Sequence, residues 1–292
     1  CDENAVHVSY CYNPFRYVWN ERHRTLAERR NPLARAVLGA LSRRWREWDW
    51  IAAQRVDHYV AISEITRRRI RNYFGRDASV VYPPVDTGRF EPATGPGKHY
   101  LVLSELVSHK RIADAVRAFT DLALPLVVVG DGPDARRLKR MAGPTITFAG
   151  RVNDTEAARL VTESRALVLT AIEEFGIAGV EAQAAGRPVI AQAGGGALET
   201  VIDGETGCFY RGGPQEIARA VTAFDTEAVD PQACVRNAAR FGREAFREGF
   251  QNEVAHAMRQ ETDRSSEILA ARRAAGDRPR LAAVRTLPGR RM

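Results

Sequence analysis

The middle of the chain alternates between short apolar runs and longer segments with helical spacing. The apolar runs lie at residues 100–104, 126–130, 146–150, 166–170 and 188–191. Segments in which apolar residues recur every three or four positions separate them, at 111–122, 134–142, 155–164 and 176–185. Continuous apolar strands that alternate with helices are typical of a parallel sheet covered on both faces. The pattern therefore predicts an α/β fold.

Elements on either side of this region are more widely spaced. Strands are expected at 6–12, 59–62 and 79–82, and helices at 32–54 and from Ser63, as N-cap, to 73. Further on, we expect a strand at 206–210, a helix from 213 to 224 and a single helix from 231 to about 258. About three strands before residue 95 are fewer than a doubly wound domain needs to bury both faces of its sheet.

This imbalance predicts three regions. Residues 1–95 would be a partial N-terminal domain, because the chain begins within it. Residues 96–260 would be a complete second domain with a closing helix, and residues 261–292 a basic, disordered tail. A naturally reduced first domain is the alternative to truncation.

The chain carries an excess of basic residues, which is concentrated in two segments. The chain has 292 residues and a net charge of +7, and the segment from Arg264 to the C-terminus contributes about +6 of basic excess. A second basic block runs from Arg22 to Arg71. Basic patches favour anionic partners, so we expect possible peripheral contact with an anionic membrane; nucleic acid is disfavoured because no nucleic-acid-binding motif is present. The four cysteines have no metal-binding spacing, and no apolar run reaches ~18 residues, which indicates a cytoplasmic protein, at most peripheral to the inner membrane face.

The strongest candidate for chemistry is a strand–turn–helix segment with two carboxylates. Glu173 follows the apolar run at 166–170, and Glu181 lies eight positions further, in the helical segment that starts at Gly176. Ligands in doubly wound sheets bind outside the carboxyl ends of the strands, where a helix N-terminus favours phosphate. Glu181 could accept hydrogen bonds from sugar hydroxyls, and Glu173 could reach a reacting centre.

These residues resemble a known enzyme family. Glu173-x7-Glu181 with Phe175-Gly176 between them resembles the E-x7-E motif of family 4 retaining glycosyltransferases, and the similarity continues through Gly186-Arg187-Pro188 to Gly195-Gly196 and Glu199. The resemblance covers some thirty positions around the motif, and the linker Tyr82-Pro83-Pro84-Val85-Asp86 also resembles the family. It implies the GT-B architecture, two Rossmann-like domains that face each other across a cleft: a complete C-terminal one and, here, an incomplete N-terminal one.

The resemblance also implies roles for individual residues. Glu173 would be the catalytic residue, and Lys110, after the strand at 100–104, would bind the donor diphosphate. Glu181 would bind the ribose. The implied donor-binding residues are Lys110, Arg111, Val152, Phe175, Gly176, Ile177, Glu181, Gly195, Gly196 and Glu199. Two positions depart from the family: Glu105 stands where an arginine is usual, and Tyr12 where many members have a histidine.

The implied activity is transfer of a sugar from a nucleotide-diphosphate donor to a glycan or lipid-linked acceptor, with retention of configuration. No metal or other cofactor is expected, because cations and helix dipoles can stabilise the leaving group. Mannose is one candidate sugar, and guanine, uracil and adenine all remain open as the base. Two alternatives remain: a fragment that binds nucleotide-sugar without turnover, and a GT-B nucleotide-sugar epimerase.

Overall fold

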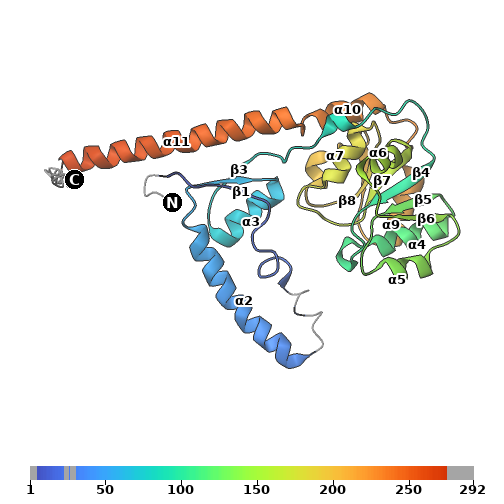
Figure 1. Cartoon of the computed structure of the whole chain (residues 1–292), viewed down its shortest axis with the longest axis horizontal. Helices are drawn as coiled ribbons and strands as arrows, with labels where there is room; N and C mark the ends of the chain where they lie inside the picture. The colour runs from blue at the N-terminus through green and yellow to red at the C-terminus, as the bar shows by residue number, and fades with distance from the viewer. Residues whose placement is uncertain (1–4, 23–25, 27–30, 275–292) are drawn as a thin grey trace, which may run out of the picture.

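The computed structural model describes residues 5–22, 26 and 31–274 of the chain. These residues form two α/β parts, which are joined by a linker and by a long C-terminal helix that returns across the first part (Figure 1). Figure 1 shows the second part on the right and the first part, with its projecting helix α2, on the left.

The second part is built on a parallel sheet, as the apolar runs predict. Its described strands follow the order β6-β5-β4-β7-β8-β9 and are parallel throughout. They are β4 (His99–Leu103), β5 (Leu126–Val129), β6 (Ile146–Gly150), β7 (Ser164–Leu169), β8 (Val189–Gln192) and β9 (Gly207–Tyr210).

Both faces of this sheet are buried, which explains why its strands are continuously apolar. On β4, Tyr100 and Val102 belong to one hydrophobic core, whereas Leu101 and Leu103 pack in the other. Helices supply the covering layers: α4 (Ile112–Leu122), α5 (Ala135–Met141), α6 (Asp154–Thr162), α7 (Ile177–Ala184), α8 (Ala197–Thr200) and α9 (Pro214–Ala223).

The strand order reverses beside β4. The chain adds β5 and β6 on one side of β4 and then crosses to the other side with β7, which is the strand order of dinucleotide-binding folds. In sheets of this order the loops after the two strands beside the reversal, here β4 and β7, leave in opposite directions, and ligands bind in the crevice outside the carboxyl ends of the strands. The glycine turn at 130–133 has a structural role, because a Cβ on Gly130 would lie 1.9 Å from the carbonyl oxygen of Ser104.

The first part contains a smaller parallel sheet. In the described residues it consists of β1 (Val8–Cys11), β2 (His58–Ala61) and β3 (Ser79–Val80), with helices α2 (Pro32–Ala53) and α3 (Glu64–Phe74). The Ser63 hydroxyl accepts a hydrogen bond from the Thr66 amide, so the predicted N-cap of α3 is confirmed. The short 3-10 helix η1 (Thr87–Arg89) lies in the linker.

The apolar stripe of α2 faces solvent. The spacing of its apolar residues correctly predicts the helix, yet Leu33, Val37, Trp48 and Ile51 are each more than half exposed. Only Ser42 and Ala53 of this helix are buried. The stripe is therefore a surface feature of the described structure.

The C-terminal region differs from the expectation in two respects. The predicted single helix from 231 is two helices, α10 (Pro231–Ala239) and α11 (Arg243–Ala274). They are separated where the Phe241 carbonyl accepts a hydrogen bond from the amide of Val85 in the linker. The prediction of disorder from residue 261 is wrong as far as Ala274, because this polar segment is rich in strong helix formers and continues α11. Residues 275–292 lie outside the described residues.

Helix α11 packs against the first part of the molecule. The rings of Phe246 and Phe250 contact Tyr10, at centroid distances of 5.5 and 5.6 Å, and Glu253 lies 2.8 Å from the His58 ring nitrogen. The closing helix thus returns to the first part. Neither α11 nor any other described helix combines the length and apolarity needed to cross a bilayer.

Candidate active site

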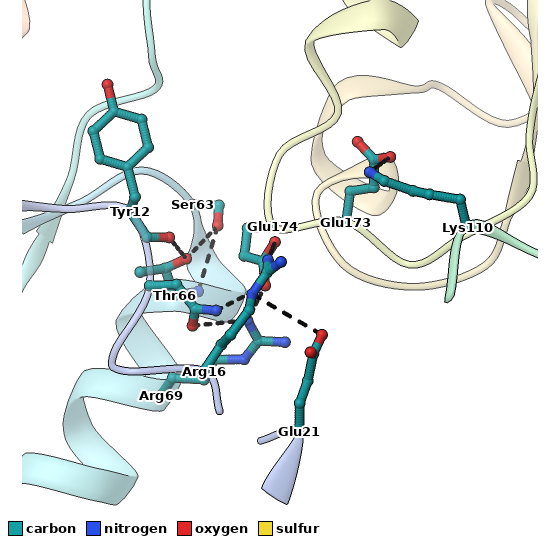
Figure 2. A network of polar contacts seen from close by, with 10 residues as sticks. Tyr12, Arg16, Glu21, Ser63, Thr66, Arg69, Lys110, Glu173 and Glu174 are labelled. Atoms are coloured by element: carbon teal, nitrogen blue, oxygen red, sulfur yellow. Dashed lines mark hydrogen bonds and ion pairs between the residues drawn. The ribbon is translucent and has the colours of Figure 1, made fainter. Parts of the chain in front are cut away.

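Lys110 and Glu173 meet at the crevice where the strand order reverses. Lys110 ends the 3-10 helix η2 (Ser108–Lys110) in the loop after β4, and Glu173 lies in the loop after the adjacent strand β7. Lys110 Nζ lies 2.6 Å from Glu173 Oε1, and both side chains are partly exposed. Sixty-three positions separate them in the sequence, and the parallel sheet brings them together, as Figure 2 shows. A cation and a carboxylate are thus placed together at the expected ligand edge of the sheet.

The backbone around this pair is held by hydrogen bonds from the same edge. The Thr170 hydroxyl, just beyond β7, donates to the carbonyl oxygen of Lys110. The Gly196 amide donates to the carbonyl oxygen of Glu173 at 2.9 Å. Three loops, after β4, β7 and β8, are therefore bonded to one another beneath the two charged side chains.

Gly195 and Gly196 are required for this close approach. Gly195 has a φ of +61°, and a Cβ on it would lie 2.1 Å from the Glu173 carbonyl oxygen. A Cβ on Gly196 would lie 2.3 Å from the Phe175 Cα. Both glycines thus pack against the turn that carries Glu173, which places them beside the candidate site.

The N-terminus of α7 points free amides toward the same loop. Gly176 is the N-cap in the left-handed conformation, and no side chain caps the helix. Ile177, its first residue, is exposed. Uncapped N–H groups and the positive end of the helix dipole favour an anionic group here.

Phe175 does not offer its side chain to a ligand. Its ring is 3% exposed and packs against Tyr82 and Phe241, at centroid distances of 5.8 and 5.5 Å. The role of Phe175 as a donor-binding residue stays a prediction and would fall to its backbone. The ring instead anchors the turn, because it joins the linker to the segment between α10 and α11.

Arg111 points away from Lys110. It has a φ of +54°, and its guanidinium donates to the Gly212 carbonyl at 2.7 Å and pairs with Asp114. The Arg111 guanidinium is therefore held by Gly212 and Asp114 in this structure, and its role as a donor-binding residue stays a prediction. Glu105, at the position where the family has an arginine, is exposed.

Glu181 makes a separate contact on α7. Its carboxylate lies 2.7 Å from the guanidinium of Arg89, which also approaches Asp154 at 3.6 Å. Burial raises the pKa of Glu181, and the positive charge of Arg89 only partly offsets this effect. Val152, after β6, is half-buried and packs against the core on this side of the sheet.

Glu199 binds the first part of the molecule. Both of its carboxylate oxygens accept hydrogen bonds from the Glu64 amide, at 2.8 and 3.0 Å, at the N-terminus of α3. Burial raises the pKa of Glu199 despite these bonds. In this structure Glu199 therefore connects the two parts, a contact that the sequence analysis did not predict.

Glu174 makes a second connection that the sequence analysis missed. Its carboxylate accepts hydrogen bonds from Arg69 at 2.7 Å, Asn13 at 2.9 Å and Arg16 at 3.0 Å (Figure 2). Burial acts to raise the pKa of Glu174, but the bonds and charges of Arg69 and Arg16 outweigh it and lower that pKa. The adjacent carboxylates Glu173 and Glu174 thus contact different parts of the molecule.

The remaining expectations for the site concern Tyr12 and a bound metal. Tyr12 is 62% exposed, its ring points away from the Glu174 cluster, and its carbonyl accepts a hydrogen bond from Thr66 (Figure 2). Among the described residues, no three His, Cys, Asp or Glu side chains gather into a potential metal site.

A comparison with known protein families places this chain in one of them. The family model for "Glycosyl transferases group 1" matches residues 89–241, just over half of the chain and all of the second sheet. The chain belongs to the group 1 glycosyl transferases. The matched region contains Lys110, Glu173 and Glu181, so the candidate site lies in the part of the chain that defines its membership.

Curated group 1 relatives support the same level of assignment. The chain is 30% identical over 222 residues to a glycogen synthase of Mycobacterium tuberculosis, a match that covers 69% of this chain and 53% of that protein. It is also 30% identical over 204 residues to a GDP-mannose-dependent alpha-(1-6)-phosphatidylinositol monomannoside mannosyltransferase of Mycolicibacterium smegmatis, over 59% of this chain and 53% of the relative. The chain spans about half the length of these curated relatives.

Solved structures share the fold. The Anabaena protein Alr3699/HepE in complex with UDP and glucose has a TM-score of 0.65 at 18% identity, over 85% of this chain and 71% of its own. The sucrose-phosphate synthase from Thermosynechococcus elongatus also has a TM-score of 0.65 at 18% identity, over 91% and 68%. The α/β fold of GT-B type is therefore confirmed. The finer assignment to family 4, with its E-x7-E motif, stays a prediction.

Proposed function

We propose that this group 1 glycosyl transferase moves a sugar from a nucleotide-diphosphate donor to a glycan or lipid-linked acceptor, with retention of anomeric configuration. The observation that carries the proposal is the contact of Lys110 with Glu173 at the crevice between β4 and β7. Ligands of such sheets bind at this crevice.

Lys110 is proposed to bind the donor diphosphate. Its ammonium pairs with Glu173 in the structure, so each charge neutralises the other. An incoming diphosphate, with more negative charge than one carboxylate, would draw the ammonium toward itself. The free amides of Ile177 and its neighbours at the start of α7 would donate hydrogen bonds to the remaining phosphate oxygens. The leaving group would then be stabilised by groups fixed before the reaction.

Glu173 is proposed to act on the donor sugar. Once Lys110 turns to the phosphates, the carboxylate can accept hydrogen bonds from sugar hydroxyls and stabilise a cationic, oxocarbenium-like transition state. Gly195 and Gly196 let the backbone after β8 pack closely against this turn. Glu181, with Arg89 as its present partner, is proposed to bind the ribose.

The proposal requires no metal ion or other cofactor. The positive charge comes from Lys110 and from the uncapped N-terminus of α7. Val152 and Glu199 are proposed as further donor contacts. Transfer measured in EDTA should therefore equal transfer measured with added Mg²⁺ or Mn²⁺. A requirement for either metal would contradict this part of the proposal.

The finer identity of donor and acceptor rests on the relatives. A mannosyl donor is supported by the similarity to GDP-mannose-dependent enzymes that act on phosphatidylinositol mannosides, and a glucosyl donor by the similarity to a glycogen synthase. We propose a mannosyl or similar hexosyl transfer in polysaccharide or glycolipid synthesis, on the cytoplasmic side of a membrane.

A membrane-facing role of α2 would suit a lipid-linked acceptor. Its exposed stripe includes Trp48 and Ile51, and Arg44 and Arg43 lie exposed on the same helix. Apolar and basic groups together favour the surface of an anionic bilayer. We expect co-sedimentation with anionic phospholipid vesicles but not with neutral ones, and loss of it in Trp48→Ser/Ile51→Ser. Equal binding to both kinds of vesicle, or no effect of the substitutions, would contradict this role.

The transfer reaction can be tested directly with GDP-mannose, UDP-glucose and ADP-glucose. Each donor is incubated with and without phosphatidylinositol and glucan acceptors, and the anomeric configuration of the product is determined by NMR. An α-linked product from an α-linked donor supports the proposal. Nucleotide binding without turnover would favour a binding fragment, and an epimer formed with donor alone would favour an epimerase; either result would overturn the proposal.

A further inference from the structure

A cavity lies at the opposite end of the second sheet from the candidate active site. It has a volume of about 390 Å³ and is lined by the linker at 93–97, by residues at the amino ends of β7 and β8, and by the segment between α9 and α10. Arg165 is the second residue of β7, and Leu169 ends that strand near the catalytic loop, so the two ends lie ~13 Å apart along the strand. The cavity is therefore separate from the Lys110–Glu173 crevice.

Arg187 brings a buried positive charge to this cavity. The residue is only 8% exposed, and its Nε donates to the carbonyl of Thr162, at the C-terminus of α6, at 2.8 Å. Within the described part of the chain, its terminal nitrogens have no hydrogen-bond partner and no carboxylate lies within ion-pair distance. A guanidinium has five N–H donors, so one carbonyl leaves most of them without a protein partner and available to a ligand.

Arg165 adds a second guanidinium to the cavity wall. Its terminal nitrogen pairs with Glu227 at 3.0 Å, and its Nε is buried without a hydrogen-bond partner. The Glu227 side chain is mostly exposed, so it is a weak counter-ion. Both arginines thus line the cavity, and Glu227, which pairs with Arg165, lines it too.

A buried cation without an anion is costly, and its donors are best satisfied by a charged acceptor. Arginine forks suit the oxygens of phosphate, and the cavity volume lies in the range of small-molecule sites. We propose that this cavity binds a phosphate group, with Arg187 and Arg165 as its ligands, either as inorganic phosphate or as the phosphate of a small sugar monoester.

The position of the cavity gives this site a structural consequence. Its wall includes the linker between the two parts of the molecule and Pro231, which starts α10 ahead of the returning helix α11. A ligand bound there would contact the linker and the start of α10. Ligand binding to the native state alone would also raise the melting temperature.

The experiment is calorimetric titration of the whole protein with inorganic phosphate and with glucose 6-phosphate, supported by thermal melting. The crevice at Lys110 can also bind phosphate, so the titrations are carried out in a Lys110→Ala background. We expect binding there, weakened at least about tenfold by Arg187→Gln and by Arg165→Gln. Arg117→Gln, which removes an arginine outside the cavity, is the matched control and should leave the affinity unchanged.

A variant that is expected to bind phosphate more tightly gives a result that misfolding cannot produce. Glu227→Gln releases Arg165 from its carboxylate, so we expect it to tighten phosphate binding. Tighter binding of glucose 6-phosphate than of phosphate identifies a sugar monoester, and the reverse identifies the free ion. Three results would each overturn the proposal. They are absence of binding in the Lys110→Ala background, equal affinity of that protein with and without the two arginine substitutions, and weaker binding after Glu227→Gln. If Arg187→Gln does not fold, Arg165→Gln and Glu227→Gln decide it.

Discussion

The carboxylates of Glu173 and Glu174, neighbours in the chain, are held by opposite parts of the molecule. Glu173 pairs with Lys110 of the second part, whereas Glu174 accepts hydrogen bonds from Asn13, Arg16 and Arg69 of the first. Every contact that fixes Glu174 therefore also fixes the backbone of the candidate catalytic residue. The arrangement couples the relative position of the two parts to the geometry of the candidate active site.

Glu173→Gln should separate transfer from binding. The amide keeps the size of the side chain but loses the negative charge that stabilises a cationic transition state, so we expect transfer to fall by ~100-fold or more. Nucleotide affinity should stay within a few-fold. Glu105→Gln removes a nearby exposed carboxylate and should retain full activity. Comparable rates for Glu173→Gln and wild type would remove Glu173 from the mechanism.

Glu174→Gln should loosen the connection between the parts. One or more charge-assisted hydrogen bonds would be weakened, each worth about 1.5–3 kcal/mol. We expect a lower transfer rate with a nearly unchanged affinity for the nucleotide, since Glu174 acts by positioning its neighbour. Steady-state kinetics with the donor varied would measure this. A change confined to donor affinity would instead place Glu174 in the donor site.

The same contact has a defined pH dependence. The pKa of Glu174 is lower in the folded protein than its ordinary value of 4.5, so the stabilisation is full above about that pH and is lost as the pH falls through the folded pKa. The difference in melting temperature between wild type and Glu174→Gln should therefore be constant near neutral pH and shrink below pH 4.5. A difference that grows on acidification would have the wrong sign.

Glu181→Gln should affect stability and donor binding in opposite directions. Burial raises the pKa of Glu181, so the ionised carboxylate costs stability at neutral pH. We expect Glu181→Gln to melt higher than wild type at pH 7, with the difference disappearing as the pH falls toward 4.5, where the carboxyl group is protonated. Donor affinity should fall nonetheless, because a ribose ligand is lost. A variant that melts lower and binds donor normally would assign Glu181 to the Arg89 contact alone.

Gly196→Ala should damage the active-site turn. A Cβ there would lie 2.3 Å from the Phe175 Cα, so the backbone has to shift, at a cost of about 1–3 kcal/mol. Both the melting temperature and the transfer rate should fall. Gly88→Ala is the matched control, because nothing lies within 4 Å of its added methyl group. Equal effects of the two substitutions would show that close packing at Gly196 is unimportant.

The sequence predicts the second part of the molecule well because its signals are local. Apolar runs such as β5 have to be buried on both faces, and the order of strands and helices then puts Lys110 and Glu173 at one edge of the sheet. The partners of Glu174 and Glu199 lie more than 100 positions away, in a different part, and no local pattern indicates them.

Other differences have identifiable physical causes. The break between α10 and α11 depends on the contact of Phe241 with Val85, a tertiary interaction that the helical periodicity does not contain. The polar stretch before Ala274 has too few apolar residues to signal a packed element, yet its helix propensity is high. The spacing along α2 predicts a helix but does not tell which face contacts protein.

Titration of UDP and GDP into wild type, Lys110→Ala and Lys98→Ala tests most directly whether the crevice between β4 and β7 holds the donor diphosphate. Lys98 is an exposed lysine that pairs with Glu163. Its substitution by alanine removes the same charge as Lys110→Ala but at a place outside the crevice. We predict that Lys110→Ala weakens the nucleoside diphosphate at least about tenfold, while Lys98→Ala binds as wild type does. Equal affinities for wild type and Lys110→Ala would contradict the assignment of this crevice as the donor site.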